Sequence, residues 1–152
     1  MKLKQWLNVL RTLLFGDTTD NETQQFCTRS TIGKQGELLA RSYLNKLGWR
    51  TVDVNIKLGN DELDLLVISP CEKVMAIIEV RTTARTTSSP ERTITVKKRV
   101  AMLRVARKLH SFAIKHRCAL RVDIIAVRLQ GKNPRIAHYE SVFPVPMTNL
   151  LK

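Results

Sequence analysis

Two runs of the chain are apolar on both faces of a strand, and they restrict the fold more than any other feature. The runs VMAIIEVRTT (74–83) and RVDIIAVRL (121–129) place apolar residues at consecutive positions rather than at alternate ones. Strands of this kind lie in the interior of a sheet that is covered on both sides. The stretch between them, 95–117, has helical periodicity, so we predict a sheet with a helical crossover.

The remaining elements complete an α/β sheet. A helix is predicted over 33–47, because its apolar residues share one face and Gly48 follows it as a C-cap. Strands are predicted over 49–55 and 62–69, and the second forms a hairpin with 74–83. The order helix, three strands, helix, strand therefore predicts an α/β fold with a meander and a crossover.

Length and composition indicate a single folded domain. A chain of 152 residues that is 43% hydrophobic can bury a core without help from disulfides or a structural metal. We divide it into an N-terminal amphipathic helix (2–15) with its linker, together 1–30, a folded domain (31–143) and a tail (144–152). The helix is expected to dock on its own domain or on a second copy, and 83–92 is expected to be a mobile loop.

Cysteine usage and hydropathy bear on the compartment. The three cysteines are an odd number, lie more than 40 residues apart and form no CxxC pair. This usage indicates a reducing, cytoplasmic compartment. No apolar run reaches the roughly 18 residues of a membrane span, so we expect no membrane partner.

Positive charge is concentrated in the second predicted helix. The chain carries a formal charge of +13, and residues 96–117 hold eight basic side chains and no acidic one. A solvated helix face is one interpretation, but such a face normally mixes charges of both signs. We therefore favour a nucleic-acid partner. The inward face of this helix is predicted to carry Val96, Val100, Leu103, Ala106, Leu109, Ala113 and Ile114.

Several carboxylates interrupt otherwise apolar elements. Glu62 and Asp64 lie two residues apart on one predicted strand, and Glu79 lies on its hairpin partner, so Asp64 and Glu79 could converge. Glu37 lies at the edge of the buried stripe of the first helix. Like charges at such a site repel, and oxygen ligands without nearby cysteine or histidine suit Mg²⁺ or Mn²⁺.

A second interpretation of these acids is structural. A strand with one solvent-facing side alternates acids with apolar residues for no catalytic reason, and Glu62 and Asp64 fit that pattern. Asp123, within the last strand, could form an ion pair with Arg121. Glu79 is harder to explain in this way, because its strand is apolar on both faces.

At these residues the sequence resembles the bacterial YraN family, also called UPF0102. Its members are small endonuclease-like proteins similar to archaeal Holliday junction resolvases, with the restriction-endonuclease-like fold of the PD-(D/E)XK nucleases. The resemblance covers about 33–143. It rests on the helix pattern GxxGExxAxxYLxxxGW, on NIKLGNDELDLLV, on IIEVR, on Lys98, on RVDII and on HYESVF.

Two positions depart from the family pattern. A glycine of the pattern is Asp61 here, which we expect to add a carboxylate beside the site. The lysine of the (D/E)XK motif is Arg81. Arginine keeps its proton, so it can stabilise developing charge but cannot activate water.

The resemblance implies an αβββαβ core with a mixed central sheet flanked by helices, and metal-dependent hydrolysis of phosphodiester bonds in branched or structured DNA. Asp64 and Glu79, with Glu62, would hold Mg²⁺ or Mn²⁺, and Glu37 and Arg81 would complete the catalytic set. A homodimer would allow symmetric resolution of a junction. The alternative is a nucleic-acid-binding protein on a nuclease scaffold, impaired by Arg81. For either function we expect the nucleic acid to contact Lys57, Lys97, Lys98, Arg99, Arg104 and Lys108.

Overall fold

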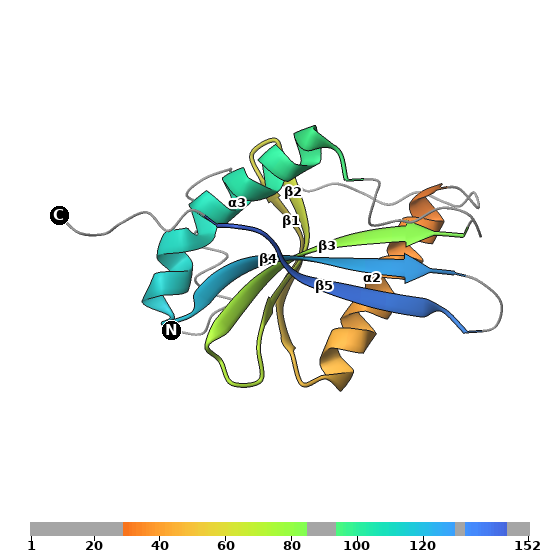
Figure 1. Cartoon of the computed structure of the whole chain (residues 1–152), viewed down its shortest axis with the longest axis horizontal. Helices are drawn as coiled ribbons and strands as arrows, with labels where there is room; N and C mark the ends of the chain where they lie inside the picture. The colour runs from red at the N-terminus through yellow and green to blue at the C-terminus, as the bar shows by residue number, and fades with distance from the viewer. Residues whose placement is uncertain (1–28, 85–93, 130–132, 146–152) are drawn as a thin grey trace, which may run out of the picture.

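The computed structural model describes residues 29–84, 94–129 and 133–145. Figure 1 shows its elements, which in chain order are α2 (Arg29–Lys46), β1 (Arg50–Leu58), β2 (Asp61–Ile68), β3 (Val74–Thr83), α3 (Val96–Lys115), β4 (Ala119–Arg128) and β5 (Arg135–Phe143). The predicted N-terminal helix, nearly all of the predicted mobile loop and most of the tail lie outside the described residues.

The five strands form one mixed sheet in the order β1-β2-β3-β4-β5. The strands β1, β2 and β3 make an antiparallel meander, β3 and β4 are parallel, and β5 returns antiparallel to β4. The helix α3 connects β3 to β4, as a parallel crossover requires. The predicted α/β class, the αβββαβ order and the mixed sheet are therefore confirmed.

Several element boundaries differ from the prediction, and one strand was missed. The helix α2 begins at Arg29, four residues before the glycine at which we placed its start. The strand β5 was not predicted, because its residues alternate poorly and nearly all of them are exposed or half-buried. As an edge strand, β5 is held by the backbone ladder with β4 and needs little apolar surface of its own.

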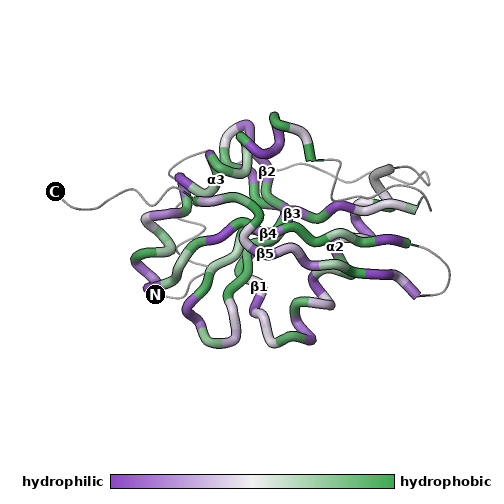
Figure 2. Tube along the Cα trace, in the orientation of Figure 1, coloured by the Kyte–Doolittle hydropathy of each residue, from purple (hydrophilic) through white to green (hydrophobic). Residues whose placement is uncertain are grey.

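One helix covers each face of the sheet. The helix α2 packs Ala40 and Leu44 against Leu65, Val67 and other residues of one face. The helix α3 covers the opposite face, over a larger cluster. Figure 2 shows that hydrophobic residues concentrate in the central strands between these layers. Neither described helix is long and apolar enough to cross a membrane.

The inward face of α3 differs from the predicted one. Ala106, Leu109 and Ala113 are buried as expected, but Val96 is 79% exposed and Val100 and Ile114 are about half exposed. The observed stripe repeats every three or four residues along the part of the helix that lies on the sheet. Its buried members are Met102, Val105, Ala106, Leu109, Phe112 and Ala113. In the first turn of α3, Val96, Lys97 and Arg99 are therefore exposed, and only Lys98 is half-buried.

Candidate active site

The site begins where β2 separates from β3. The two strands pair from Ile68 with Met75 to Leu65 with Ile78. One residue further along β2, the carboxylate of Asp64 accepts the backbone N–H of Val80 at 2.7 Å. A side chain thus satisfies a donor of β3 at the end of the ladder, as buried backbone groups require. This contact fixes the Asp64 carboxylate against the middle of β3.

Glu79 is the central residue of the site. Its side chain is only 5% exposed, and its carboxylate lies 2.7 Å from Nζ of Lys98 and 3.5 Å from Nε of Arg81. Burial, and then the charge of Asp64, raises the pKa of Glu79 to about 7, although Lys98 and Arg81 act in the opposite direction. Burial also raises the pKa of Asp64. The two carboxylates therefore form a poorly solvated pair with two cations beside it.

The helix α2 brings Glu37 to this pair. The neighbouring residue Gly36 packs directly on β3, where a Cβ atom would overlap the side chain of Thr82. Burial, followed by the charge of Asp64, raises the pKa of Glu37, and a hydrogen bond with Asn55 lowers it. The close approach of α2 to β3 thus sets Glu37 beside Asp64. Sequence analysis predicted that these acids would gather, but it did not identify the glycine contact.

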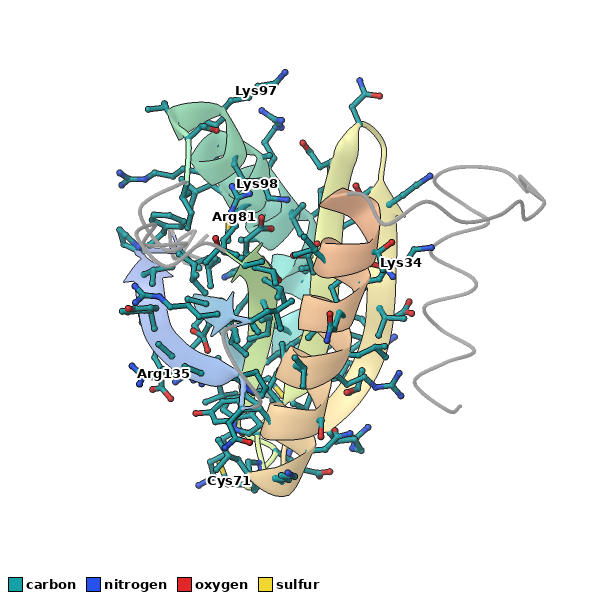
Figure 3. The ribbon with its side chains drawn as sticks, turned by 90° about the vertical axis from the view of Figure 1, so that its right-hand side faces the viewer. Lys34, Cys71, Arg81, Lys97, Lys98 and Arg135 are labelled. Atoms are coloured by element: carbon teal, nitrogen blue, oxygen red, sulfur yellow. The ribbon has the colours of Figure 1, made fainter. Side chains whose placement is uncertain are left out.

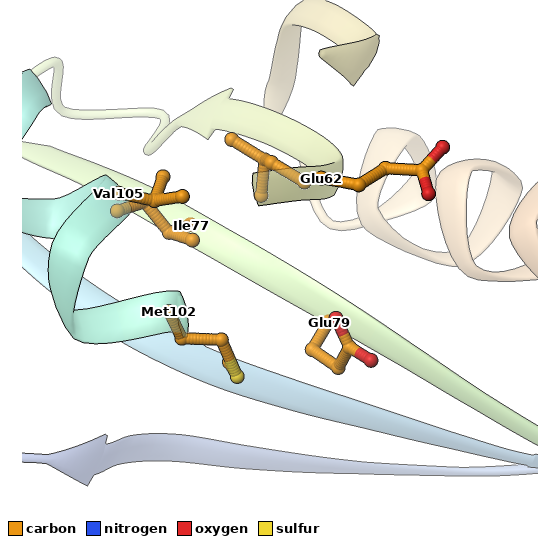
Figure 4. Close-up of a pocket in the computed structure, with 6 residues that line it drawn as sticks. Glu62, Ile77, Glu79, Met102 and Val105 are labelled. Carbon is orange, nitrogen blue, oxygen red and sulfur yellow. The ribbon is translucent and has the colours of Figure 1, made fainter. Parts of the chain in front are cut away.

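Glu62 occupies the rim of the site. Its side chain is exposed, and Figure 4 shows its carboxylate pointing toward α2 and away from Glu79. Its backbone carbonyl lies 3.4 Å from Nζ of Lys98. Figure 4 also shows the apolar residues that share a small pocket with the two glutamates, and they explain why Glu79 is poorly solvated. The pocket is lined by Glu62, Leu63, Ile77, Glu79, Met102 and Val105.

Cations from three elements surround the carboxylates. Figure 3 shows Arg81 of β3, Lys98 of α3 and Lys34 of α2 at the same end of the molecule, while Cys71 lies at the opposite end. Lys98 is held in place by the first turn of α3, whose N-cap Thr95 accepts the backbone N–H of Lys98 at 3.2 Å. The charge of Lys34 lowers the pKa of Glu37. The buried acids are therefore enclosed by a positive rim.

Asp61 does not add a carboxylate beside the site, so that prediction was wrong. Its side chain is buried under α3, where Arg104 donates to it at 2.6 Å and 3.1 Å and Nζ of Lys108 lies 3.7 Å away. Arg104 holds the pKa of this carboxyl below its ordinary value. Lys108 also donates to the carbonyl of Leu58 at 2.8 Å. The acid turns toward α3 because two cations of that helix lie within reach.

The predicted nucleic-acid contacts fall into two groups. Arg104 and Lys108 bond to the β1–β2 hairpin, and Arg99 lies over the ring of Phe143 at 4.9 Å. Lys57 and Lys97 are exposed, as are Arg99, Arg104 and Lys108, and Figure 3 shows Lys97 at the tip of α3. The structure thus assigns part of the basic helix to holding the fold together.

Asp123 belongs to a separate, structural cluster. It is fully buried and forms the expected ion pair with Arg121, at 2.9 Å. It also lies 2.9 Å from Nε2 of His138 and accepts the backbone N–H of Ser141 at 2.9 Å, where the register of β5 shifts. The histidine partner was not predicted, because the two residues meet only when β5 pairs with β4.

The carboxylate oxygens of Asp64 and Glu79 suit a hard divalent cation. Within 29–84, 94–129 and 133–145, no group of three or more histidine, cysteine, aspartate or glutamate side chains is close enough to hold a metal ion. Mg²⁺ commonly takes only one or two carboxylates, with water and substrate phosphate as its other ligands. Asp64 and Glu79 supply such a pair, and the charge of Asp64 acts on Glu79, so the two carboxylates lie close together.

Fold and site together define an α/β protein whose buried carboxylate pair lies where an antiparallel meander meets a parallel crossover. A family model described as "Uncharacterised protein family UPF0102" matches residues 36–127. The chain belongs to this family.

Curated relatives and one solved structure were also found. The UPF0102 protein of Mycolicibacterium gilvum is 33% identical over 122 residues, covering 76% of this chain and 95% of the relative. That of Anaeromyxobacter dehalogenans is 31% identical over 120 residues, covering 76% and 85%. The structure of Pyrococcus furiosus SfsA in complex with Ca²⁺ aligns with 14% identity and a TM-score of 0.33 over 73% of this chain and 63% of that one, too slight a likeness to support an argument.

Proposed function

We propose that this protein hydrolyses phosphodiester bonds in nucleic acid with the help of a divalent metal ion. The observation that carries the proposal is the buried pair Asp64 and Glu79, whose Glu79 has a pKa of about 7, inside a rim of cations. Buried acids with perturbed pKa values are typical of catalytic sites. The positive rim suits a polyanionic substrate.

Asp64 and Glu79 would hold Mg²⁺ or Mn²⁺, and Glu62, whose carboxylate points away from Glu79, would contribute only after its side chain turns toward the pair. A metal ion bound there supplies a more acidic water molecule and neutralises charge on the scissile phosphate. Nζ of Lys98, 2.7 Å from Glu79, already balances part of this charge in the protein alone. Lys98 therefore orients the Glu79 carboxylate and would share it with a bound metal ion.

The other residues have roles that follow from their chemistry. The Arg81 guanidinium, 3.5 Å from Glu79, stays protonated and stabilises the negative charge that develops on the phosphate. Glu37, beside Asp64, is poised to accept a hydrogen bond from an attacking water molecule. Lys57 and Lys97, which are exposed, would contact the flanking backbone. DNA with a branched or structured form is the substrate that the family resemblance favours.

A second candidate is a nucleic-acid-binding protein without turnover. Two observations favour it: position 81 holds arginine instead of the motif lysine, and Lys98 already neutralises Glu79. In that case the acids would serve the fold, and the positive rim alone would serve the function. The two candidates differ in whether the carboxylate pair is needed for a chemical step.

A cleavage assay on branched and single-stranded DNA with Mn²⁺ separates them. For the enzyme, we expect cleavage by the wild type that is lost in Asp64→Asn and in Glu79→Gln. Cleavage only after Arg81→Lys, or cleavage that survives in Asp64→Asn, would contradict the proposal. A second measurement does not depend on turnover: Mn²⁺ should raise the thermal midpoint of the wild type but not that of Asp64→Asn, because only the former binds the ion.

Compartment and assembly are part of the same proposal. We propose a cytoplasmic protein, since the two described cysteines are free thiols. We also propose that two copies pair on a branched substrate. Light scattering that shows a monomer at micromolar protein, with and without a four-way junction, would remove the dimer.

A further inference from the structure

A second surface adjoins the carboxylates and was not identified from the sequence. Figure 1 shows β3, β4 and β5 continuing past α3 on the side of the sheet that α3 covers, with α2 behind them. In the sheet register, Arg81 lies beside Ala126, and Ala126 lies opposite Ala137. The next row on the same face contains Thr83, Arg128 and Arg135. The surface is therefore continuous with the row that holds Glu79.

Small residues form the floor of this surface, and long ones form its border. It is an open hollow lined by Ala126, Arg128, Arg135, Ile136, Ala137 and Tyr139. Tyr139 is 40% exposed and lies opposite Ile124, in the row of Glu79. The two alanines leave room above the sheet that larger side chains would fill. The lining residues come from the adjacent strands β4 and β5, which lie about 5 Å apart, so the hollow follows these two strands and an extended chain can lie along it.

The charged and aromatic side chains at the border of the hollow indicate which kind of ligand it can bind. Arg128 and Arg135 are positive, and Glu79, the acid in the row of Tyr139, is paired with Lys98. An exposed aromatic ring beside cations is the pattern by which proteins hold unpaired nucleic acid, with phosphates on the cations and a base on the ring. In a duplex the base faces are stacked inside the helix, where a ring on a flat sheet cannot reach them.

We propose that this hollow binds an unpaired nucleic-acid strand and leads it to the carboxylates, with a base stacked on Tyr139 and phosphates on Arg128 and Arg135. The inference rests on the proposed function, and it defines the substrate class as nucleic acid with a single-stranded segment. Stacking on one ring is tolerant of sequence, so no base preference is expected.

Binding without metal tests this proposal. The full chain is titrated, in the presence of EDTA, into fluorescein-labelled oligothymidylate and into a duplex of equal length, and anisotropy is recorded. We expect Tyr139→Ala to weaken binding of the single strand by roughly 5-fold to 100-fold, the loss expected for one stacked base, with little change for the duplex. Tyr139→Phe keeps the ring and should bind like the wild type. Arg135→Ala should reduce the salt slope for the single strand by about 0.7.

The matched control is Arg41→Ala. Arg41 is an exposed arginine on α2, behind the opposite face of the sheet, and its removal should leave single-strand affinity unchanged. As a second measurement, photocrosslinking of a bromouracil oligonucleotide should label the β5 peptide in the wild type. Wild-type affinity in Tyr139→Ala, equal losses for single strand and duplex, or crosslinks confined to other peptides would overturn the proposal. These binding assays need no hydrolysis, so their result holds even if the protein cleaves nothing. Conversely, a negative binding result does not affect the cleavage assay, which tests the proposed function separately.

Discussion

Replacing Glu79 by glutamine tests whether the negative charge of this carboxylate destabilises the folded protein. The wild-type carboxyl has a pKa of about 7 in the folded protein, against an ordinary value of 4.5. The folded state therefore holds a proton that the unfolded chain releases between these values. The stability that Glu79 contributes is fully present at low pH and is lost as the pH rises through 7.

The magnitude follows from the same two values. Each pH unit of difference corresponds to about 1.4 kcal/mol, so the whole effect is about 3 kcal/mol, of which about 2.5 kcal/mol falls between pH 5 and pH 8. Glutamine keeps the shape of the side chain and does not titrate. We expect the stability of Glu79→Gln, relative to the wild type, to rise by about this amount from pH 5 to pH 8.

The assay is urea unfolding of both proteins at several pH values. The control is Glu72→Gln, because Glu72 forms only an exposed ion pair with Arg50 at the opposite end of the sheet. Its difference from the wild type should stay nearly constant with pH. Parallel profiles for Glu79→Gln and the wild type would refute the reasoning, since they would show that burial and Asp64 do not destabilise the Glu79 carboxylate.

Three further predictions concern the framework of the site. Gly36→Ala should lower the free energy of unfolding in urea by about 1–3 kcal/mol, because the added methyl group meets β3. Gly33→Ala is the control: nothing lies near its Cβ position, so it should be neutral or stabilising. Equal effects of the two substitutions would contradict the close approach of α2 to β3. Lys97→Ala should reduce the slope of log affinity against log salt for duplex binding by about 0.9. Arg104→Ala should leave this slope unchanged and lower the thermal midpoint of unfolding, because Arg104 bonds to Asp61. The reverse result would show that Arg104 contacts phosphate. Asp123→Ala should cost about 3–5 kcal/mol in urea unfolding, because it removes the buried carboxylate that pairs with Arg121 and accepts the backbone N–H of Ser141. A loss below about 1 kcal/mol would refute this role.

The sequence determined the described elements of this protein except β5, and the residue types of its candidate site. Consecutive apolar residues in β3 and β4 require cover on both faces, and that requirement predicted the crossover helix. Asp64 and Glu79 could be identified as candidate site residues because a carboxylate within an otherwise apolar strand requires a structural or catalytic explanation. These are local properties of periodicity and composition, which can be read without knowing what lies opposite.

The tertiary structure decided which groups meet. Asp64 reaches β3 because β2 leaves the ladder at that point, and Asp61 turns to α3 because Arg104 lies there. Likewise, the buried stripe of α3 is set by where the helix rests on the sheet, and the surface beside Tyr139 exists because β5 extends past that helix. Each of these features depends on contacts between residues far apart in the chain. Hydrophobic periodicity indicates which face of an element is buried, but it does not indicate which distant residue packs against that face.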